Sequence, residues 1–197
     1  DVPGAAAFLG EPAPAGTPEP GALVRRLTGG GAIHHQRELT FSLTAAADHP
    51  VYRGPVAASY ERVHEALASA LERAGARAVP RAGERPASEA KGTGMCFHHS
   101  SPLDLVWDGR KGVGSAQRRT GARVLHHGSI KLGGTELDTG VAGLDLASPA
   151  ELAPLVAHAF EAWFDVRLEP GVPTALEAER ATERVAHFTS DAFLRRR

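Results

Sequence analysis

The sequence of 197 residues contains a single cysteine, Cys96. One cysteine cannot close an internal disulfide, so the packing of the core must hold the fold, and we expect a reducing compartment, the cytoplasm. The chain also lacks an apolar run of the length that spans a bilayer and the charged and apolar pattern of a signal peptide. These absences predict a protein with no membrane partner.

The chain also has no excess of charge of either sign. Its 22 Lys and Arg residues nearly balance its 23 Asp and Glu residues, and the formal net charge is -1. No global field draws such a chain to nucleic acid or to a membrane surface. Any anionic partner must therefore be bound locally. The length is that of one ordinary domain, and we expect a single domain over residues 1–197.

Several stretches predict strands. Residues 1–21 are rich in Pro, Gly and Ala and predict a surface loop, and residues 22–26 form a short apolar stretch that ends at a glycine run. Residues 38–44 alternate apolar and polar side chains, which is typical of a strand, and we expect them to pair with 22–26. An Asp-Gly turn at 108–109 joins two further strands, and residues 124–132 supply another.

Other stretches predict helices. Val56 to Leu71 carries apolar side chains at helical spacing, and Gly75 lies where a C-terminal cap belongs. Ser148 and Thr174 each precede a glutamate by three residues, which is the capping-box pattern of a helix start. A strand-rich middle followed by helices predicts an α+β fold with a mixed β-sheet flanked by helices.

Three motifs carry residues that could do chemistry. In RRLTGGGAIHH, at 25–35, consecutive glycines let the backbone approach a ligand, although a hairpin turn explains them equally, and Arg26 could simply solvate a strand edge. In GRKGVGSAQRR, Lys111 is either a charge for a developing oxyanion or a solvated strand lysine. In GMCFHH, Cys96 is either a nucleophile that needs a nearby cation or a small buried side chain.

Taken together, RRLTGGGAIHHQRELTFSL, CFHHSSPLDLVWDGRKGVGSAQRR and VLHHGSIKL resemble, in order and spacing, the biotin/lipoate protein ligase family. This family includes lipoate ligases and octanoyltransferases, and the resemblance runs over most of the chain. It implies the α+β catalytic domain of biotin and lipoate ligases, which is similar to that of class II synthetases. It also implies that the chain lacks the family's N-terminal helix and opening strand.

The Cys-Phe pair at 96–97 is similar to that of the octanoyltransferase branch. The resemblance therefore implies that Cys96 takes the octanoyl group from octanoyl-acyl carrier protein as a thioester and passes it to a lysine of a lipoyl domain or of the glycine cleavage H protein. It implies that Lys111 contacts the acyl carbonyl and that neither a metal nor ATP is required. The substrate-binding residues that it implies are Arg26, Gly29, Gly30, Gly31, His34, Gly114, Ser115, His127 and Gly128.

Two alternatives remain open at this point. The first is an ATP-dependent lipoate-protein ligase, which would use ATP and Mg and for which Cys96 is incidental. The second is a non-catalytic remnant that binds lipoyl domains or acyl groups. The transferase hypothesis makes a geometric prediction that separates it from both: Cys96, Lys111 and the glycines at 29–31 should face one cavity that continues as an apolar slot, with His98 and His99 as further candidates for deprotonating the thiol.

Overall fold

The structure is a computed structural model that describes residues 25–83, 85–146 and 148–194. The loop expected over 1–21 lies outside these residues, as does most of the strand expected over 22–26. Arg25 and Arg26 are described and belong to neither a helix nor a strand. The pairing expected between 22–26 and 38–44 is not what the described residues show, because the partner of 38–44 is a later strand.

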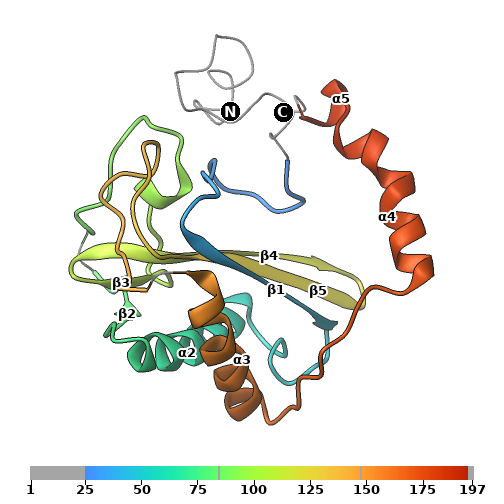
Figure 1. Cartoon of the computed structure of the whole chain (residues 1–197), viewed down its shortest axis with the longest axis horizontal. Coiled ribbons are helices and arrows are strands. Elements are labelled where there is room, and N and C mark those ends of the chain that lie inside the picture. Colours follow the sequence, from blue (N-terminus) through green and yellow to red (C-terminus); the bar gives the residue numbers. More distant parts are fainter. Residues whose placement is uncertain (1–24, 84, 147, 195–197) are drawn as a thin grey trace.

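One five-stranded sheet lies at the centre of the molecule (Figure 1). Its strands follow the order β1-β5-β4-β3-β2, and all of the pairings between them are antiparallel. The α+β fold is confirmed, whereas the parallel component expected of the sheet is reduced, in the described residues, to a single bridge between Ala32 and Met95. The strand bounds are β1 Glu38–Ala46, β2 Val79–Pro80, β3 Leu105–Trp107, β4 Arg110–Thr120 and β5 Arg123–Lys131.

Two pairs of neighbouring strands show how the sheet is built. β1 pairs with β5 along its whole length, from Glu38 opposite Lys131 to Ala46 opposite Arg123. β3 and β4 are joined by the predicted turn, in which Asp108 and Gly109 have φ angles of 50° and 67°. Two consecutive positive φ angles are the requirement of the tight hairpin turns that Asp-Gly favours, so the sequence signal and the backbone agree.

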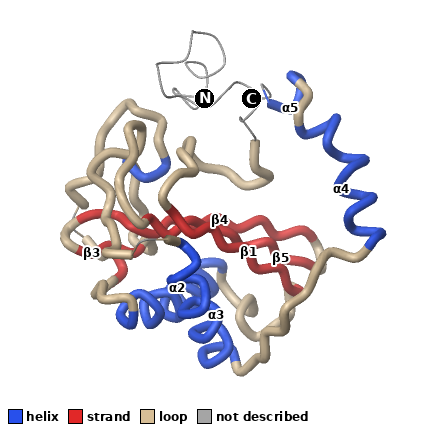
Figure 2. The backbone as a smooth tube through the Cα atoms, in the orientation of Figure 1, coloured by secondary structure: helices blue, strands red, loops and turns tan. Residues whose placement is uncertain are grey.

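Two helices cover one face of the sheet, as Figures 1 and 2 show. They are α2 (Val56–Arg73) and α3 (Pro149–Phe164), and they bury apolar side chains against the strands. α2 ends as predicted, since Gly75 directly follows the last turn with a φ of 89°. The opposite face of the sheet carries mostly loops, with one short helical turn among them (Figure 2). Most residues of the motifs singled out in the sequence lie in these loops or on the strands that the loops cover.

The C-terminal helices extend away from the sheet (Figure 1). α4 (Ala175–Phe188) begins at the predicted capping box, where the Glu177 amide donates to the Thr174 hydroxyl at 3.2 Å. No residue of α4 is buried. α5 (Asp191–Leu194) is connected to the body of the protein, since Arg25 Nε donates to the Leu194 carbonyl at 2.8 Å. Among the described helices, none combines the length and the apolar character needed to cross a membrane.

A polar chain lies inside the core between α2 and the sheet. His64 Nδ1 contacts the Leu103 carbonyl, so its Nε2 is left to accept from the Ser115 hydroxyl at 2.7 Å. Ser115 in turn accepts from His126 Nε2 at 3.0 Å, and His126 Nδ1 accepts from the Gln117 amide at 3.1 Å. With both histidines neutral, each of these hydrogen bonds has one donor and one acceptor. Protonation of His126 would place an N–H at Nδ1 opposite the Gln117 amide donor and break that bond.

Burial sets the charge state of these histidines. Burial lowers the pKa of His126 to about 3, with smaller contributions from the charges of His64, His127 and Arg119. Burial also lowers the pKa of His64, more strongly than the Leu103 carbonyl and Asp104 raise it. An unfolded histidine titrates near pH 6.5, so protons bind the unfolded chain first. The stability contributed by His126 is fully present above about pH 6.5 and is lost as the pH falls towards about 3, and the lowered pKa of His64 acts in the same direction.

We therefore expect His126→Gln to flatten the pH dependence of stability. The variant loses one of the two titrating groups, so its free energy of unfolding should fall less steeply than that of the wild type between about pH 6.5 and pH 4. Urea unfolding at a series of pH values measures both slopes. The carboxylates contribute equally to the two proteins and cancel in the comparison. Identical slopes would show that His126 does not bind a proton on unfolding in this range.

Candidate active site

The loop that carries the cysteine ends in a single helical turn, η2 (Cys96–His98). Phe97 is fully buried, and Cys96 is a partly exposed residue. His98 is also buried, and both of its ring nitrogens are used, Nδ1 with the Thr93 hydroxyl at 2.9 Å and Nε2 with the Thr139 carbonyl at 3.2 Å. His98 thus anchors the loop, and its contacts do not favour the role of a base for the thiol.

The glycine segment lies directly beside the cysteine loop. The Ala32 amide donates to the Gly94 carbonyl at 2.9 Å, and the Cys96 amide donates to the Ala32 carbonyl at 2.7 Å. A Cβ atom at Gly31 would overlap the Gly94 carbonyl oxygen. Glycine is therefore required at this position by the close approach of two backbones. The two motifs, more than sixty residues apart in the sequence, form one site.

The side chain of Arg26 is hydrogen-bonded to the glycine segment. Its Nη2 donates to the carbonyls of Gly29 and Gly31 at 2.8 and 2.7 Å, and its Nε donates to Gly29 at 3.2 Å. Gly30 has a φ of 103°, and a Cβ atom built on it would lie 2.7 Å from Arg26 Nη2 and 3.9 Å from Cys96 Sγ. The guanidinium and the thiol are therefore neighbours across a glycine without a side chain.

Lys111 approaches the cysteine loop from β4. Its ammonium donates to the carbonyls of Cys96 at 3.1 Å and His99 at 2.7 Å, and it pairs with Asp104 at 2.9 Å. The side chain is 3% exposed, and an ammonium has only three N–H donors. All three are occupied here. Lys111 is thus placed at the site as expected, but its contacts are those of a residue that positions the cysteine loop.

A second buried lysine, Lys131, was not singled out in the sequence. Its ammonium donates to the His34 carbonyl at 2.9 Å and pairs with Glu38 at 2.7 Å and Asp138 at 2.9 Å. Burial raises the pKa of Glu38, but hydrogen bonds from His35 and Lys131 outweigh it and lower the pKa to about 2. The sequence signal was a lysine within the otherwise apolar end of a strand.

Phe97 connects the two lysines. The Lys111 ammonium lies 5.2 Å from the centroid of its ring, and the Lys131 ammonium lies 4.8 Å from it. Both distances are within the range of a cation–π interaction. The residue that follows the cysteine is therefore fixed by two charged groups on neighbouring strands, which restricts how far the cysteine loop can shift.

The other residues implied by the resemblance are divided between the two faces of the sheet. Gly114 lies on the loop face, where its Cβ position is 3.3 Å from the Lys111 ammonium. His127 is on the same face, with its Nε2 2.7 Å from the Thr28 hydroxyl. Ser115 instead faces α2 through His64, and the Cβ position of Gly128 is 2.8 Å from the buried ring of Phe41. The structure therefore gives Ser115 and Gly128 packing roles and does not favour contact with a substrate.

His127 is half-buried, and its pKa is lowered, first by burial and then by the nearby charges of Arg26 and His35. The ring is therefore favoured in its neutral form, in which one nitrogen can accept a proton. His34 lies further along the glycine segment, where Nδ1 contacts the Thr135 hydroxyl at 2.9 Å. Its backbone amide also approaches Asp138 at 3.4 Å.

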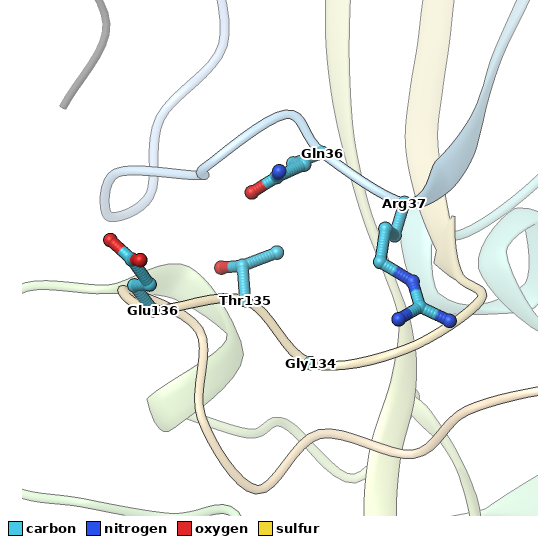
Figure 3. Close-up of a pocket in the computed structure, with 5 residues that line it drawn as sticks. All are labelled: Gln36, Arg37, Gly134, Thr135 and Glu136. Atoms are coloured by element: carbon cyan, nitrogen blue, oxygen red, sulfur yellow. The ribbon is translucent and has the colours of Figure 1, made fainter. Parts of the chain in front are cut away.

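A cavity of about 300 Å³ is lined by polar side chains of residues 36–37 and of the loop at 134–136 (Figure 3). Because its walls are polar, it is not the apolar slot expected for an acyl chain, and that slot stays a prediction. In the described ranges, no three His, Cys, Asp or Glu side chains gather as they would around a metal ion. The residues that line the cavity are Gln36, Arg37, Gly134, Thr135 and Glu136.

The fold is that of lipoate ligase catalytic domains. A solved structure of this kind is that of a bi-partite lipoate protein ligase, reported with its E2 lipoyl domain, from Thermoplasma acidophilum. It superposes with a TM-score of 0.67 at 21% sequence identity and covers 89% of this chain and 72% of that one. At this identity the likeness establishes the architecture alone.

The sequence establishes the family. The family model of the lipoyl protein ligase A/B catalytic domain matches residues 18–139, and the chain belongs to this family. Octanoyltransferase LipM of Moorella thermoacetica is 46% identical over 110 residues, which cover 56% of this chain but only 40% of that protein. Octanoyltransferase LipM of Kyrpidia tusciae is 32% identical over 198 residues and covers 86% of this chain and 72% of its own length.

Proposed function

We propose that the protein is an acyltransferase that moves an octanoyl group from acyl carrier protein to a lysine of a lipoyl domain or of the glycine cleavage H protein. The observation that carries the proposal is the position of Cys96, a partly exposed residue on a loop hydrogen-bonded to the glycine segment. The similarity to octanoyltransferases of two organisms supports the same activity.

The reaction proceeds in two exchanges at Cys96. The thiolate attacks the thioester carbonyl, a new carbon–sulfur bond forms, and the carrier's thiolate leaves. The amine of the target lysine then attacks the acyl-enzyme, an amide forms, and the Cys96 thiolate is restored while the amine loses a proton to solvent. Because the acyl group arrives already activated as a thioester, the proposed reaction needs neither ATP nor a metal.

The residues around Cys96 have distinct proposed roles. Lys111 and Asp104 hold the carbonyl of Cys96 and the following turn in place, and Lys111 can reach an acyl oxygen only by giving up one of its three acceptors. Gly31 allows the glycine segment to pack closely against the cysteine loop, and Gly30 places no side chain between Arg26 and the sulfur. Loss of this arrangement misplaces the nucleophile, which is costly because small displacements strongly reduce the rate of a positioned reaction.

Intact-mass analysis separates this proposal from its alternatives. The purified chain is mixed either with octanoyl-acyl carrier protein or with octanoate and Mg-ATP, and a lipoyl domain is then added. We expect the first mixture to add one octanoyl group to the chain, in a bond that hydroxylamine cleaves, and then to modify the lipoyl domain. Modification that requires ATP would identify a ligase, and modification in neither mixture would indicate a binding remnant.

A further inference from the structure

The geometry points to Arg26 as the catalytic cation of this site, in contact with the reacting atoms during acyl transfer. We infer that its guanidinium stabilises the thiolate of Cys96 and donates a hydrogen bond to the oxyanion of the tetrahedral intermediate. The second part of the inference, the hydrogen bond to the oxyanion, rests on the proposed octanoyl transfer. The first part, the stabilisation of the thiolate, concerns only the thiol and its neighbour.

The first argument is distance. Arg26 Nη2 lies 2.7 Å and Cys96 Sγ lies 3.9 Å from one point, the Cβ position of Gly30. The separation of the nitrogen and the sulfur cannot exceed the sum of these distances, and this upper bound lies slightly above the roughly 4–6 Å over which a charge acts on a titrating group. Gly30 places no side chain between them.

The second argument is that the guanidinium is held in place and still has donors left. Nε and Nη2 donate to the carbonyls of Gly29 and Gly31, so the planar group cannot swing away. An arginine side chain has five N–H donors. The hydrogen bonds described for Arg26 use Nε and Nη2 and leave both Nη1 donors available. Donors that are fixed before reaction are the kind that stabilise a developing oxyanion.

The third argument is that the neighbouring cations are already neutralised or occupied. Lys111 pairs with Asp104 and two carbonyls, and Lys131 pairs with two carboxylates. No carboxylate is among the partners described for Arg26. The other titratable and charged groups of the site lie on the cysteine loop and on the segments that contact it or one another, and they are His98, His99, Asp104, Lys111, His127, Lys131, Glu38 and Asp138.

The proposed step is balanced without any further reactant. The thiol proton passes to solvent, and the thiolate attacks the thioester carbonyl, whose oxygen becomes an anion that accepts from Arg26. Collapse of the intermediate expels the carrier's thiolate, which takes up a proton from solvent. Arg26 stays protonated throughout, because a guanidinium does not lose its proton in proteins. It therefore acts by charge and hydrogen bonding and never as a base.

The test compares Arg26→Gln with Arg26→Lys. Glutamine keeps an N–H donor for the glycine carbonyls but has no charge, whereas lysine keeps the charge but loses the planar fork. The chain has a single cysteine, so the rate of alkylation by iodoacetamide reports on Cys96 alone. Alkylation is measured as a function of pH, and formation of the octanoyl adduct is measured by rapid-quench mass spectrometry.

We expect Arg26→Gln to move the midpoint of the alkylation profile to higher pH and to slow adduct formation by about 10²–10³-fold, the usual effect of losing one oxyanion donor. Arg26→Lys should keep the alkylation profile close to that of the wild type. Arg25→Gln is the matched control, because Arg25 contacts the Leu194 carbonyl at the C-terminal helices and should change neither measurement. Circular dichroism verifies that each variant is folded.

The opposite pattern would overturn the inference. If Arg26 only supports the glycine segment, Arg26→Gln keeps both the wild-type alkylation profile and the wild-type rate of adduct formation, because glutamine still donates to the glycine carbonyls. Should Arg26→Gln fail to fold, the wild-type profile still decides, since salt screens the attraction and must move the midpoint to higher pH. A profile that salt leaves unchanged contradicts the inference. If the wild type forms no octanoyl adduct while the midpoint shifts as expected, the proposed function fails and the thiolate role stands.

Discussion

Replacing Cys96 by alanine is expected to abolish the octanoyl adduct and the transfer to a lipoyl domain while leaving the fold intact. The side chain is the only proposed nucleophile, so no acyl-enzyme can form without it. The loop should keep its shape, because its hydrogen bonds to Ala32 and Lys111 come from the backbone of residue 96 and not from the sulfur. Intact mass and thermal melting measure the two outcomes.

Cys96→Ser is the informative companion to the alanine variant. A serine hydroxyl is similar in size to the thiol but is a much weaker nucleophile at neutral pH without an adjacent base. We expect it to melt like the wild type and to form at most traces of an ester that resists hydroxylamine better than a thioester does. Transfer by the alanine variant at the wild-type rate would exclude Cys96 as the nucleophile and direct attention to the ATP-dependent route.

Gly31→Ala is expected to reduce adduct formation by about 10²-fold or more, because misplacing a catalytic group by about 1 Å can have that effect. The added methyl group would overlap the Gly94 carbonyl oxygen and would come within 3.0 Å of the Cys96 amide. Both neighbours are backbone atoms, which cannot rotate away as a side chain can. The glycine segment and the cysteine loop must therefore separate, which breaks the bonds through Ala32.

Gly29→Ala is the matched control for this prediction. It lies two residues away on the same segment, its Cβ position has no atom within 4 Å, and its φ is not in the left-handed region. We expect adduct formation near the wild-type rate and an unchanged melting temperature. The same single-turnover assay serves both variants. Equal loss of activity in both would show that the segment needs general flexibility, and equal retention would show that its contact with the cysteine loop does not matter.

Several elements of the fold could be predicted because their signals are local. The alternation in β1, the Asp-Gly turn before β4 and the capping box at Thr174 each depend on residues a few positions apart. Backbone sterics and short-range hydrogen bonds decide such features, so the sequence contains the information directly. The α+β class followed from the order of these elements. The association of Cys96, Lys111 and the glycines followed from the family resemblance and not from local patterns.

The face of the sheet to which each β4 residue points could not be read from the sequence. Simple alternation puts Lys111 and Ser115 on one face and Gly114 on the other. The pairing of β3 with β4 shifts between Leu105 and Val106, which inserts one extra residue after Lys111. One inserted residue exchanges the two faces of everything that follows. Gly114 therefore joins Lys111 at the site, and Ser115 turns to the histidines of the core.

The roles of the charged groups were also decided only by the tertiary structure. The sequence offered Lys111 as a charge for a developing oxyanion, but the folded chain surrounds its ammonium with two carbonyls and Asp104. Arg26, which the sequence could explain as a solvated strand edge, instead lies beside the sulfur across Gly30. The sequence determines which charged side chains are available to the site. Long-range packing determines which of their N–H donors are already used in hydrogen bonds within the protein. The chemistry of the site depends on the donors that remain.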